Sequence, residues 1–104
     1  MLALLAATAF AAAQTAPGNA GAAAGVFKEN CSMCHGDDGT GSPFGARLNV
    51  KSLSSKEIQD KPSADLAKII KDGKNNMPGF ASKLNDDQVQ ELIDYIRHQL
   101  AKPH

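Results

Sequence analysis

Apolar residues recur at helical spacing in three stretches of this chain, and no stretch convincingly predicts a strand. The clearest stretch lies near the C-terminus. Its expected apolar face consists of Val89, Leu92, Ile93, Ile96 and Leu100. Asn85 and Gln88 form a capping-box signature before this run, and the acidic residues between them suit the positive end of a helix dipole. We therefore predict a helix that begins after Asn85 and ends before Pro103.

A second helix is predicted in the middle of the chain. Ser63 can cap its start, Leu66, Ile69 and Ile70 form an apolar stripe, and Gly73 stands where a C-terminal glycine belongs.

Two further helical segments are predicted from local signals. Residues 22–30 can form a helix whose apolar and charged side chains lie on opposite sides. Ser54 stands three residues before Glu57, which is a capping-box spacing, and Pro62 would stop the short helix that follows.

Two loops separate these helices. Residues 36–45 hold four glycines and one proline, too many for a helix or a strand, and residues 74–81 are irregular around Met77. The chain is therefore predicted to be all-α, with three main helices, irregular loops and no internal repeat.

The first residues predict export. Residues 1–13 are apolar and rich in alanine and end in small residues, as a signal peptide does, although no Lys or Arg follows Met1. An alanine-rich N-terminal helix of the mature protein is the alternative. Residues 14–21 then read as a flexible lead and residues 22–104 as one domain. The stretch is shorter than the roughly 20 residues of a membrane span, so we expect no stable membrane insertion and a periplasmic or exported protein.

Composition narrows the function classes. The formal net charge is zero, which gives no reason to expect nucleic-acid binding. A single domain of this length buries a modest share of its surface, and the chain has no Trp. A large bound group could act as both staple and core, and few aromatic residues are then needed.

The chemistry of the chain centres on Cys31-Ser32-Met33-Cys34-His35. Two thiols three positions apart with an imidazole directly after them are the pattern of covalent haem attachment. On one helical turn both sulfurs can form thioethers with the vinyl groups of one porphyrin, and His35 can give a nitrogen to the iron. The predicted cofactor is therefore one haem c, bound through Cys31 and Cys34.

Three other interpretations of the two cysteines account less well for the sequence. A disulfide between them would close too small a loop to stabilise much. A thioredoxin-like pair needs a βαβ context, and the sequence predicts no strand. A zinc site needs four N or S ligands, but His98 and His104 lie far from the two cysteines in the sequence. None of these readings explains why His35 adjoins Cys34.

A haem bound by His35 needs a sixth iron ligand or an open position. Met33 lies inside the attachment turn and cannot reach over the ring, His98 falls on a polar helix face, and His104 is a chain end. A lysine also remains a candidate. Met77 differs because Pro78 restricts its backbone to extended conformations on a loop between two helices. We predict Met77 as the ligand, against the alternative of an ordinary core methionine.

Over most of residues 22–104 the chain resembles the small monohaem c-type cytochromes with His/Met ligation. Four features carry the resemblance: the Cys31–His35 motif after a helix, the glycine-rich loop, Met77-Pro78-Gly79-Phe80, and the C-terminal helix around Tyr95. The resemblance implies a cytochrome c-like fold, with three main helices and loops wrapped around one covalent haem.

In that family the first and last helices cross and pack through one aromatic residue each, and Phe27 and Tyr95 match those positions. The resemblance also suggests that Pro43 or a neighbouring carbonyl orients His35 through its other ring nitrogen. Arg47 is a candidate contact of a haem propionate, and an ordinary solvated arginine is the alternative.

The expected function is one-electron transfer between redox partners, not catalysis, because two strong axial ligands leave no open site on the iron. A haem enzyme or gas sensor with a displaceable sixth ligand is the alternative, and a haem domain of a larger oxidase or dehydrogenase is a third reading. We expect a monomer. Four lysines flank the Met77 loop: Lys68, Lys71, Lys74 and Lys83. They predict a basic rim that steers an acidic partner protein. An ordinary solvated lysine face is the alternative.

Overall fold

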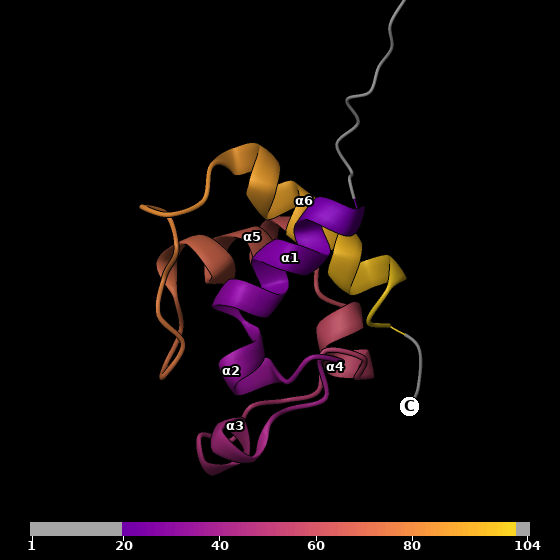
Figure 1. Cartoon of the computed structure of the whole chain (residues 1–104), viewed down its shortest axis with the longest axis vertical. Helices are drawn as coiled ribbons and strands as arrows, with labels where there is room; N and C mark the ends of the chain where they lie inside the picture. The colour runs from indigo at the N-terminus through magenta and orange to yellow at the C-terminus, as the bar shows by residue number, and fades with distance from the viewer. Residues whose placement is uncertain (1–19, 102–104) are drawn as a thin grey trace, which may run out of the picture.

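The computed structural model describes residues 20–101, which form an all-helical domain (Figure 1). Three longer helices dominate it: α1 (Ala20–Asn30), α5 (Ser63–Asp72) and α6 (Asp86–His98). Three short helices stand between α1 and α5: α2 (Ser32–His35), α3 (Pro43–Arg47) and α4 (Lys56–Gln59). The described residues hold no sheet, and the one isolated β-bridge among them joins Lys74 to Met77. The predicted signal peptide and His104 lie outside this range.

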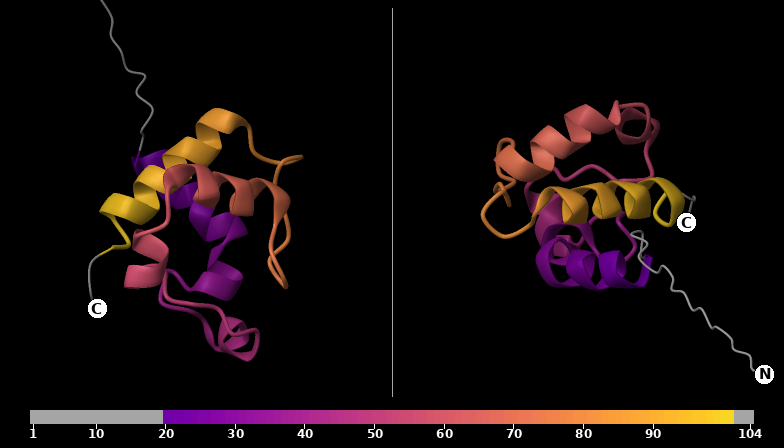
Figure 2. Two further views of the ribbon diagram at one scale, coloured as in Figure 1. Left: turned by 180° about the vertical axis from the view of Figure 1, so that it is seen from behind. Right: turned by 90° about the horizontal axis from the view of Figure 1, so that it is seen from above.

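Helix α6 is the centre of the packing, since it contacts both α1 and α5 (Figure 2). The predicted capping box is confirmed: the Asn85 side chain accepts from Gln88 N at 2.8 Å, and the Gln88 side chain accepts from Asn85 N at 2.9 Å. The apolar stripe that follows is buried, with Val89, Leu92 and Ile93 each 1% exposed.

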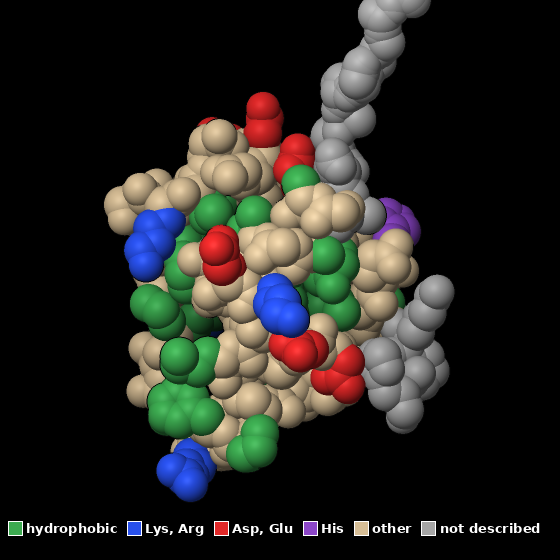
Figure 3. Space-filling model, in the orientation of Figure 1, with side chains coloured by type: hydrophobic (Ala, Val, Ile, Leu, Met, Phe, Trp, Pro, Cys, Tyr) green, Lys and Arg blue, Asp and Glu red, His purple; other side chains and the backbone are tan. Residues whose placement is uncertain are grey.

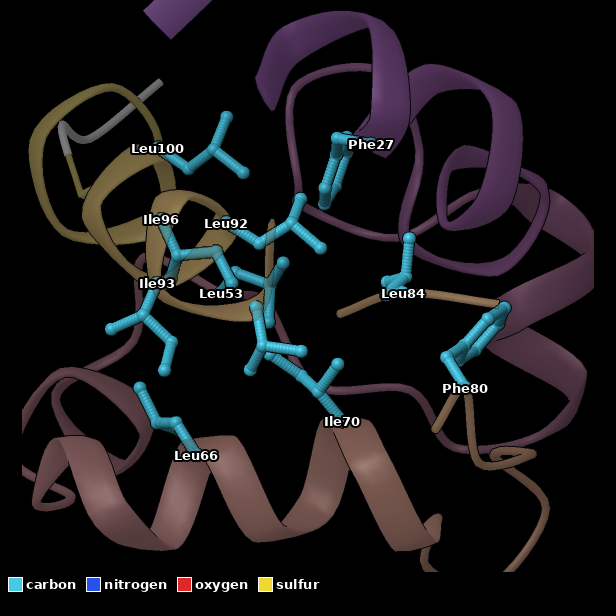
Figure 4. Packing of buried hydrophobic residues seen from close by; sticks show 11 residues of the cluster. Phe27, Leu53, Leu66, Ile70, Phe80, Leu84, Leu92, Ile93, Ile96 and Leu100 are labelled. Atoms are coloured by element: carbon cyan, nitrogen blue, oxygen red, sulfur yellow. The ribbon is translucent and has the colours of Figure 1, made fainter. Parts of the chain in front are cut away.

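Helix α1 meets α6 through the expected aromatic pair. The ring centroids of Phe27 and Tyr95 are 5.5 Å apart with the planes tilted by 48°, a geometry that aromatic pairs favour. Phe27 is 2% exposed and points toward Leu92 (Figure 4). Ala23, one turn earlier, is also buried. The contact thus forms where the resemblance placed it.

The remainder of the core comes from α5 and from loops. Leu66 and Ile70 of α5 face α6, and Phe80 and Leu84 approach from the segment between α5 and α6 (Figure 4). Leu53 from the segment before α4 completes the cluster. Full burial of such side chains stabilises the fold by about 1.5–3 kcal/mol each.

Several predicted helix starts are corrected by the structure. Helix α1 begins at Ala20, two residues inside the predicted lead. The cap of α4 is Ser55, whose hydroxyl accepts from Ile58 N at 3.4 Å, not Ser54. The N-cap of α5 is Pro62, with Ser63 as the first helical residue. Each of these starts differs from the prediction by one or two residues, a range within which helix ends commonly vary.

The glycine-rich stretch is only partly a loop. Pro43 begins the short helix α3, where a missing backbone N–H is no loss. Ser42 caps it by accepting from Gly45 N at 2.9 Å. The glycines therefore did not prevent a helix, since only those before Ser42 adopt positive φ.

Among the described residues, no helix is both long and apolar enough to cross a membrane.

Candidate functional site

The cysteine–histidine motif forms a helical turn that continues directly from α1. Cys31 N donates to Phe27 O at 2.8 Å and His35 N donates to Cys31 O at 2.9 Å. Both cysteines carry free thiols. The His35 ring lies beside Phe27, with 6.3 Å between ring centroids, so the motif is tied to the α1–α6 contact.

Helix α3 braces this turn from the other side. The Ser42 hydroxyl donates to Met33 O at 2.5 Å. Ser42 N donates to Cys34 O at 3.0 Å, and Gly41 N donates to His35 O at 2.6 Å. Gly45 lies so close that a Cβ built on it would stand 1.9 Å from Cys34 O. Only glycine permits this approach.

Met77 lies on a tight loop after α5. Lys74 and Met77 exchange backbone hydrogen bonds of 3.0 and 2.9 Å, which makes a turn with Asn75 at φ 54°. Asn tolerates that left-handed conformation better than most residues do. Farther on, Phe80 N donates to Ile70 O at 2.9 Å, so the loop returns to the end of its own helix.

One cavity joins the two segments. It has a volume of about 440 Å³, within the range of small-ligand and cofactor pockets. Cys31, Cys34, His35 and Met77 all line it. Most of the remaining wall is apolar and comes from α1, α5, α6 and the segments between them, including Phe27, Leu53, Ile58, Ile69, Phe80 and Leu92.

Burial shapes the protonation of the motif. It lowers the pKa of the His35 imidazole below its ordinary value of 6.5, so the ring is neutral at pH 7 and has a lone pair for a metal. Burial, with a smaller repulsion from Cys34, raises the pKa of the Cys31 thiol to about 11. A reactive redox pair needs the opposite shift, which argues against the thioredoxin-like reading.

The hydrogen bonding of the second ring nitrogen of His35 differs from the prediction. Its Nδ1 is buried, and no group among the described residues forms a hydrogen bond with it, neither Pro43 nor a neighbouring carbonyl. The nearby carbonyls of Met33, Cys34 and His35 already accept from Ser42 and Gly41. A buried imidazole with unused capacity at the edge of an apolar cavity fits a metal ligand better than a structural residue.

The comparisons with known proteins agree with this geometry. The family model described as cytochrome C oxidase, cbb3-type, subunit III matches residues 18–96. The chain belongs to this family and is a c-type cytochrome. A cytochrome c6 of Leptolyngbya boryana is 36% identical over 85 residues, covering 80% of this chain and 98% of that protein. A cytochrome c6 of Parathermosynechococcus lividus is 33% identical over 77 residues, 74% of this chain and 86% of that one.

A longer relative contains a segment that is similar to this chain. The menaquinol:cytochrome c reductase cytochrome c subunit of Bacillus subtilis (strain 168) is 38% identical over 78 residues, which are 74% of this chain and 28% of that protein. Among solved structures, the KustC0563 c-type cytochrome matches with a TM-score of 0.71 at 24% identity, covering 77% of this chain and 98% of that one. The predicted cytochrome c-like fold is thus confirmed.

Membership of this family implies a covalently attached haem c, and this c-type cytochrome is a cytochrome c6-like electron carrier, as predicted. The residues present fit that group: two free thiols and a neutral imidazole follow one another on a helical turn that lines an apolar cavity. Bound there, haem c exchanges one electron between its ferrous and ferric states. The described residues hold no cluster of three or more His, Cys, Asp or Glu side chains that could bind another metal.

The other predicted site residues lie apart from the cavity or at its edge. Arg47 is exposed in the last turn of α3 and does not line the cavity, so its contact with a propionate stays a prediction. His98 is exposed, and its Nδ1 lies 2.9 Å from Asp94 O. Met33 lines the cavity from within the attachment turn but is 73% exposed.

The sequence interpretation missed three features that support the site. Ser42 and Gly45 brace the motif, and Lys61 lines the cavity. The Ser42-Pro43 pair is a helix-start signal that could have been recognised. Gly45 and Lys61 carried no such signal, because their roles come from segments distant in the chain.

Proposed function

We propose that this c-type cytochrome is an exported one-electron carrier whose haem iron is bound by His35 and Met77. The observation that carries the proposal is that Met77 lines the same cavity as Cys31, Cys34 and His35. Met77 lies far from these three residues in the sequence. Met77 is half-buried and packs against the core. A thioether opposite an imidazole raises the potential of haem iron.

Two strong ligands would also restrict the chemistry. With both axial positions filled, the protein offers no place for O₂ or a substrate to bind the iron. Among the residues that line the cavity within the described part, His35 is the single histidine, so there is no second imidazole for acid–base chemistry. This supports electron transfer over the alternative of an enzyme or gas sensor.

The export part of the proposal rests on residues 1–13 alone, whose composition resembles a signal peptide. Sequencing the N-terminus of the protein isolated from the periplasm tests it, with cleavage near Gln14 as the expected result.

Electrons would enter and leave where the cavity meets the surface beside the attachment turn. Hydrophobic side chains gather on the side of the molecule where α2, α3 and the Met77 loop lie (Figure 3). Met33 and Phe44 are its large exposed members, 73% and 47% accessible. Exposed apolar residues at such a surface suit transient contact with a partner protein.

The proposed basic rim depends on fewer lysines than predicted. Lys68 pairs with Asp72 at 3.0 Å, and Lys71 pairs with Asp86 at 2.8 Å. Lys74 and Lys83 have no acidic partner among the described residues, and Lys83 lies over the Phe80 ring at 5.9 Å. Steering of an acidic partner would therefore rest on these two cations.

The decisive experiment compares wild-type protein and Met77→Ala, both expressed with cytochrome c maturation. We expect both to carry covalent haem, and the weak near-infrared band of a ferric thioether–haem bond to be present in wild type and absent from the variant. Met33→Ala is the matched control and should keep the band. A wild type that lacks the band and binds CO rapidly when reduced would instead support the sensor or enzyme.

A further inference from the structure

Three lysines line the cavity, and one of them has an unusual environment. Lys51 and Lys74 are exposed, whereas Lys61 is half-buried. The Lys51 ammonium lies 3.5 Å from the Glu57 carboxylate. No carboxylate of the described residues pairs with Lys61. Lys61 is thus a cation at an apolar cavity that the described part of the chain leaves without a counter-ion.

The backbone that carries Lys61 is held by α6. Arg97 donates through Nη1 to Gln59 O at 2.8 Å and through Nη2 to Lys61 O at 2.5 Å. The Gln59 amide in turn donates to Leu53 O at 2.8 Å and to Ile96 O at 3.2 Å. These bonds span up to 38 positions of sequence, so they fix this wall of the cavity against the C-terminal helix.

A partly buried ammonium beside apolar side chains is stabilised when an anion lies close to it. Two carboxylates also line the cavity: Glu57 pairs with Lys51 at 3.5 Å, and no ion pair among the described residues joins Glu29 to Lys61. Haem c brings two carboxylates of its own, and these take no part in attachment, which uses the vinyl groups. The cavity therefore combines an unpaired cation on the protein with unpaired anions on its cofactor.

We infer that Lys61 binds a haem propionate through a charge-assisted hydrogen bond. Arg47, the other candidate contact, is exposed and does not line the cavity, so Lys61 is the better placed of the two. The inference rests on the proposed function in needing the covalent haem. It does not need Met77 as a ligand.

The pair has a consequence for the redox potential. An ionised propionate favours the ferric state, and a nearby ammonium offsets that charge. Removing the ammonium should lower the midpoint potential. An exposed lysine elsewhere should have little effect, since water and salt screen its charge.

The test compares Lys61→Met with Lys61→Arg, Lys68→Met and Arg47→Met in the haem-loaded protein. We expect Lys61→Met to lower the midpoint potential and to shift the propionate carboxylate bands in redox-induced infrared difference spectra. Lys61→Arg should largely retain the wild-type midpoint potential and propionate bands. Lys68→Met and Arg47→Met should match wild type in both. Thermal unfolding of each variant separates a loss of fold from a loss of the pair, and Lys61→Gln replaces Lys61→Met if the latter unfolds.

Equal potentials and equal propionate bands in Lys61→Met and Lys68→Met would overturn the inference. A change of the propionate bands in Arg47→Met with none in Lys61→Met would also overturn it, in favour of Arg47. The near-infrared band of the same samples reports Met77 ligation separately, so failure of one proposal is not mistaken for failure of the other.

Discussion

The segments that carry His35 and Met77 share one backbone conformation at a glycine and differ in the contacts that hold them in place. His35 is the last residue of a helix that ends at a glycine, and Met77 follows a helix that ends at a glycine of nearly the same conformation. Gly36 has φ 79° and ψ 158°, and Gly73 has φ 84° and ψ 170°. This region of backbone space is essentially restricted to glycine. In both cases it turns the chain sharply beside the cavity.

The supports of the two segments are different. The His35 turn is braced by a separate helix, through the Ser42 hydroxyl and the close approach of Gly45 to Cys34. The Met77 loop is closed on itself and on the end of α5, almost wholly by backbone hydrogen bonds. The comparison teaches that the attachment turn depends on contacts with a separate helix, whereas the Met77 loop depends mainly on backbone hydrogen bonds within its own segment and to the end of α5.

The largest expected effect follows from Gly45→Ala. The new Cβ would stand 1.9 Å from Cys34 O, a backbone atom that cannot move without the attachment turn. We expect a loss of about 3 kcal/mol or more in the free energy of unfolding and poor haem attachment. Denaturant unfolding and the yield of covalent haem measure this.

Gly25→Ala is the matched control for that experiment. Gly25 is exposed within α1 and has nothing within 4 Å of a built Cβ. Alanine there should stabilise the helix by up to about 1 kcal/mol. Normal stability and haem yield in Gly45→Ala would show that α3 does not brace the motif.

An intermediate effect is expected from Gly73→Ala. Its Cβ would lie 2.6 Å from Met77 O, and its φ of 84° is strained for alanine. We expect a cost of about 2 kcal/mol confined to the loop. Haem should still attach while the near-infrared band of the thioether bond is lost. Retention of the band together with wild-type stability would mean that the Met77 loop is not held through Gly73.

The smallest effect is expected from Ser42→Ala, compared with Ser55→Ala. Each serine caps a short helix, and each loss should cost about 1 kcal/mol. Only Ser42 also contacts the attachment turn, so only Ser42→Ala should alter the midpoint potential. Identical midpoint potentials in the two variants would mean that Ser42 acts only as a helix cap and does not influence the haem.

Local signals account for most of what the sequence predicted correctly. The capping box at Asn85, the C-terminal Gly73, the apolar face of α6 and the Cys31–His35 motif all depend on residues within a few positions of one another. Such patterns describe interactions that form within one or two helical turns, so a single sequence reveals them. The errors at Ser54 and Ser63 shift a helix start by one residue, and α3 is a short helix within a segment predicted to be a loop.

Only the tertiary structure decided which distant side chains share the cavity. It brought Met77 to the wall that holds Cys31 and His35, left Arg47 outside, and placed Lys61 inside through hydrogen bonds from Arg97. It also required glycine at position 45, because two backbones meet there. The physical reason is that these relations depend on how helices pack against one another, and packing distances and directions are set by the whole fold, not by any one stretch of sequence.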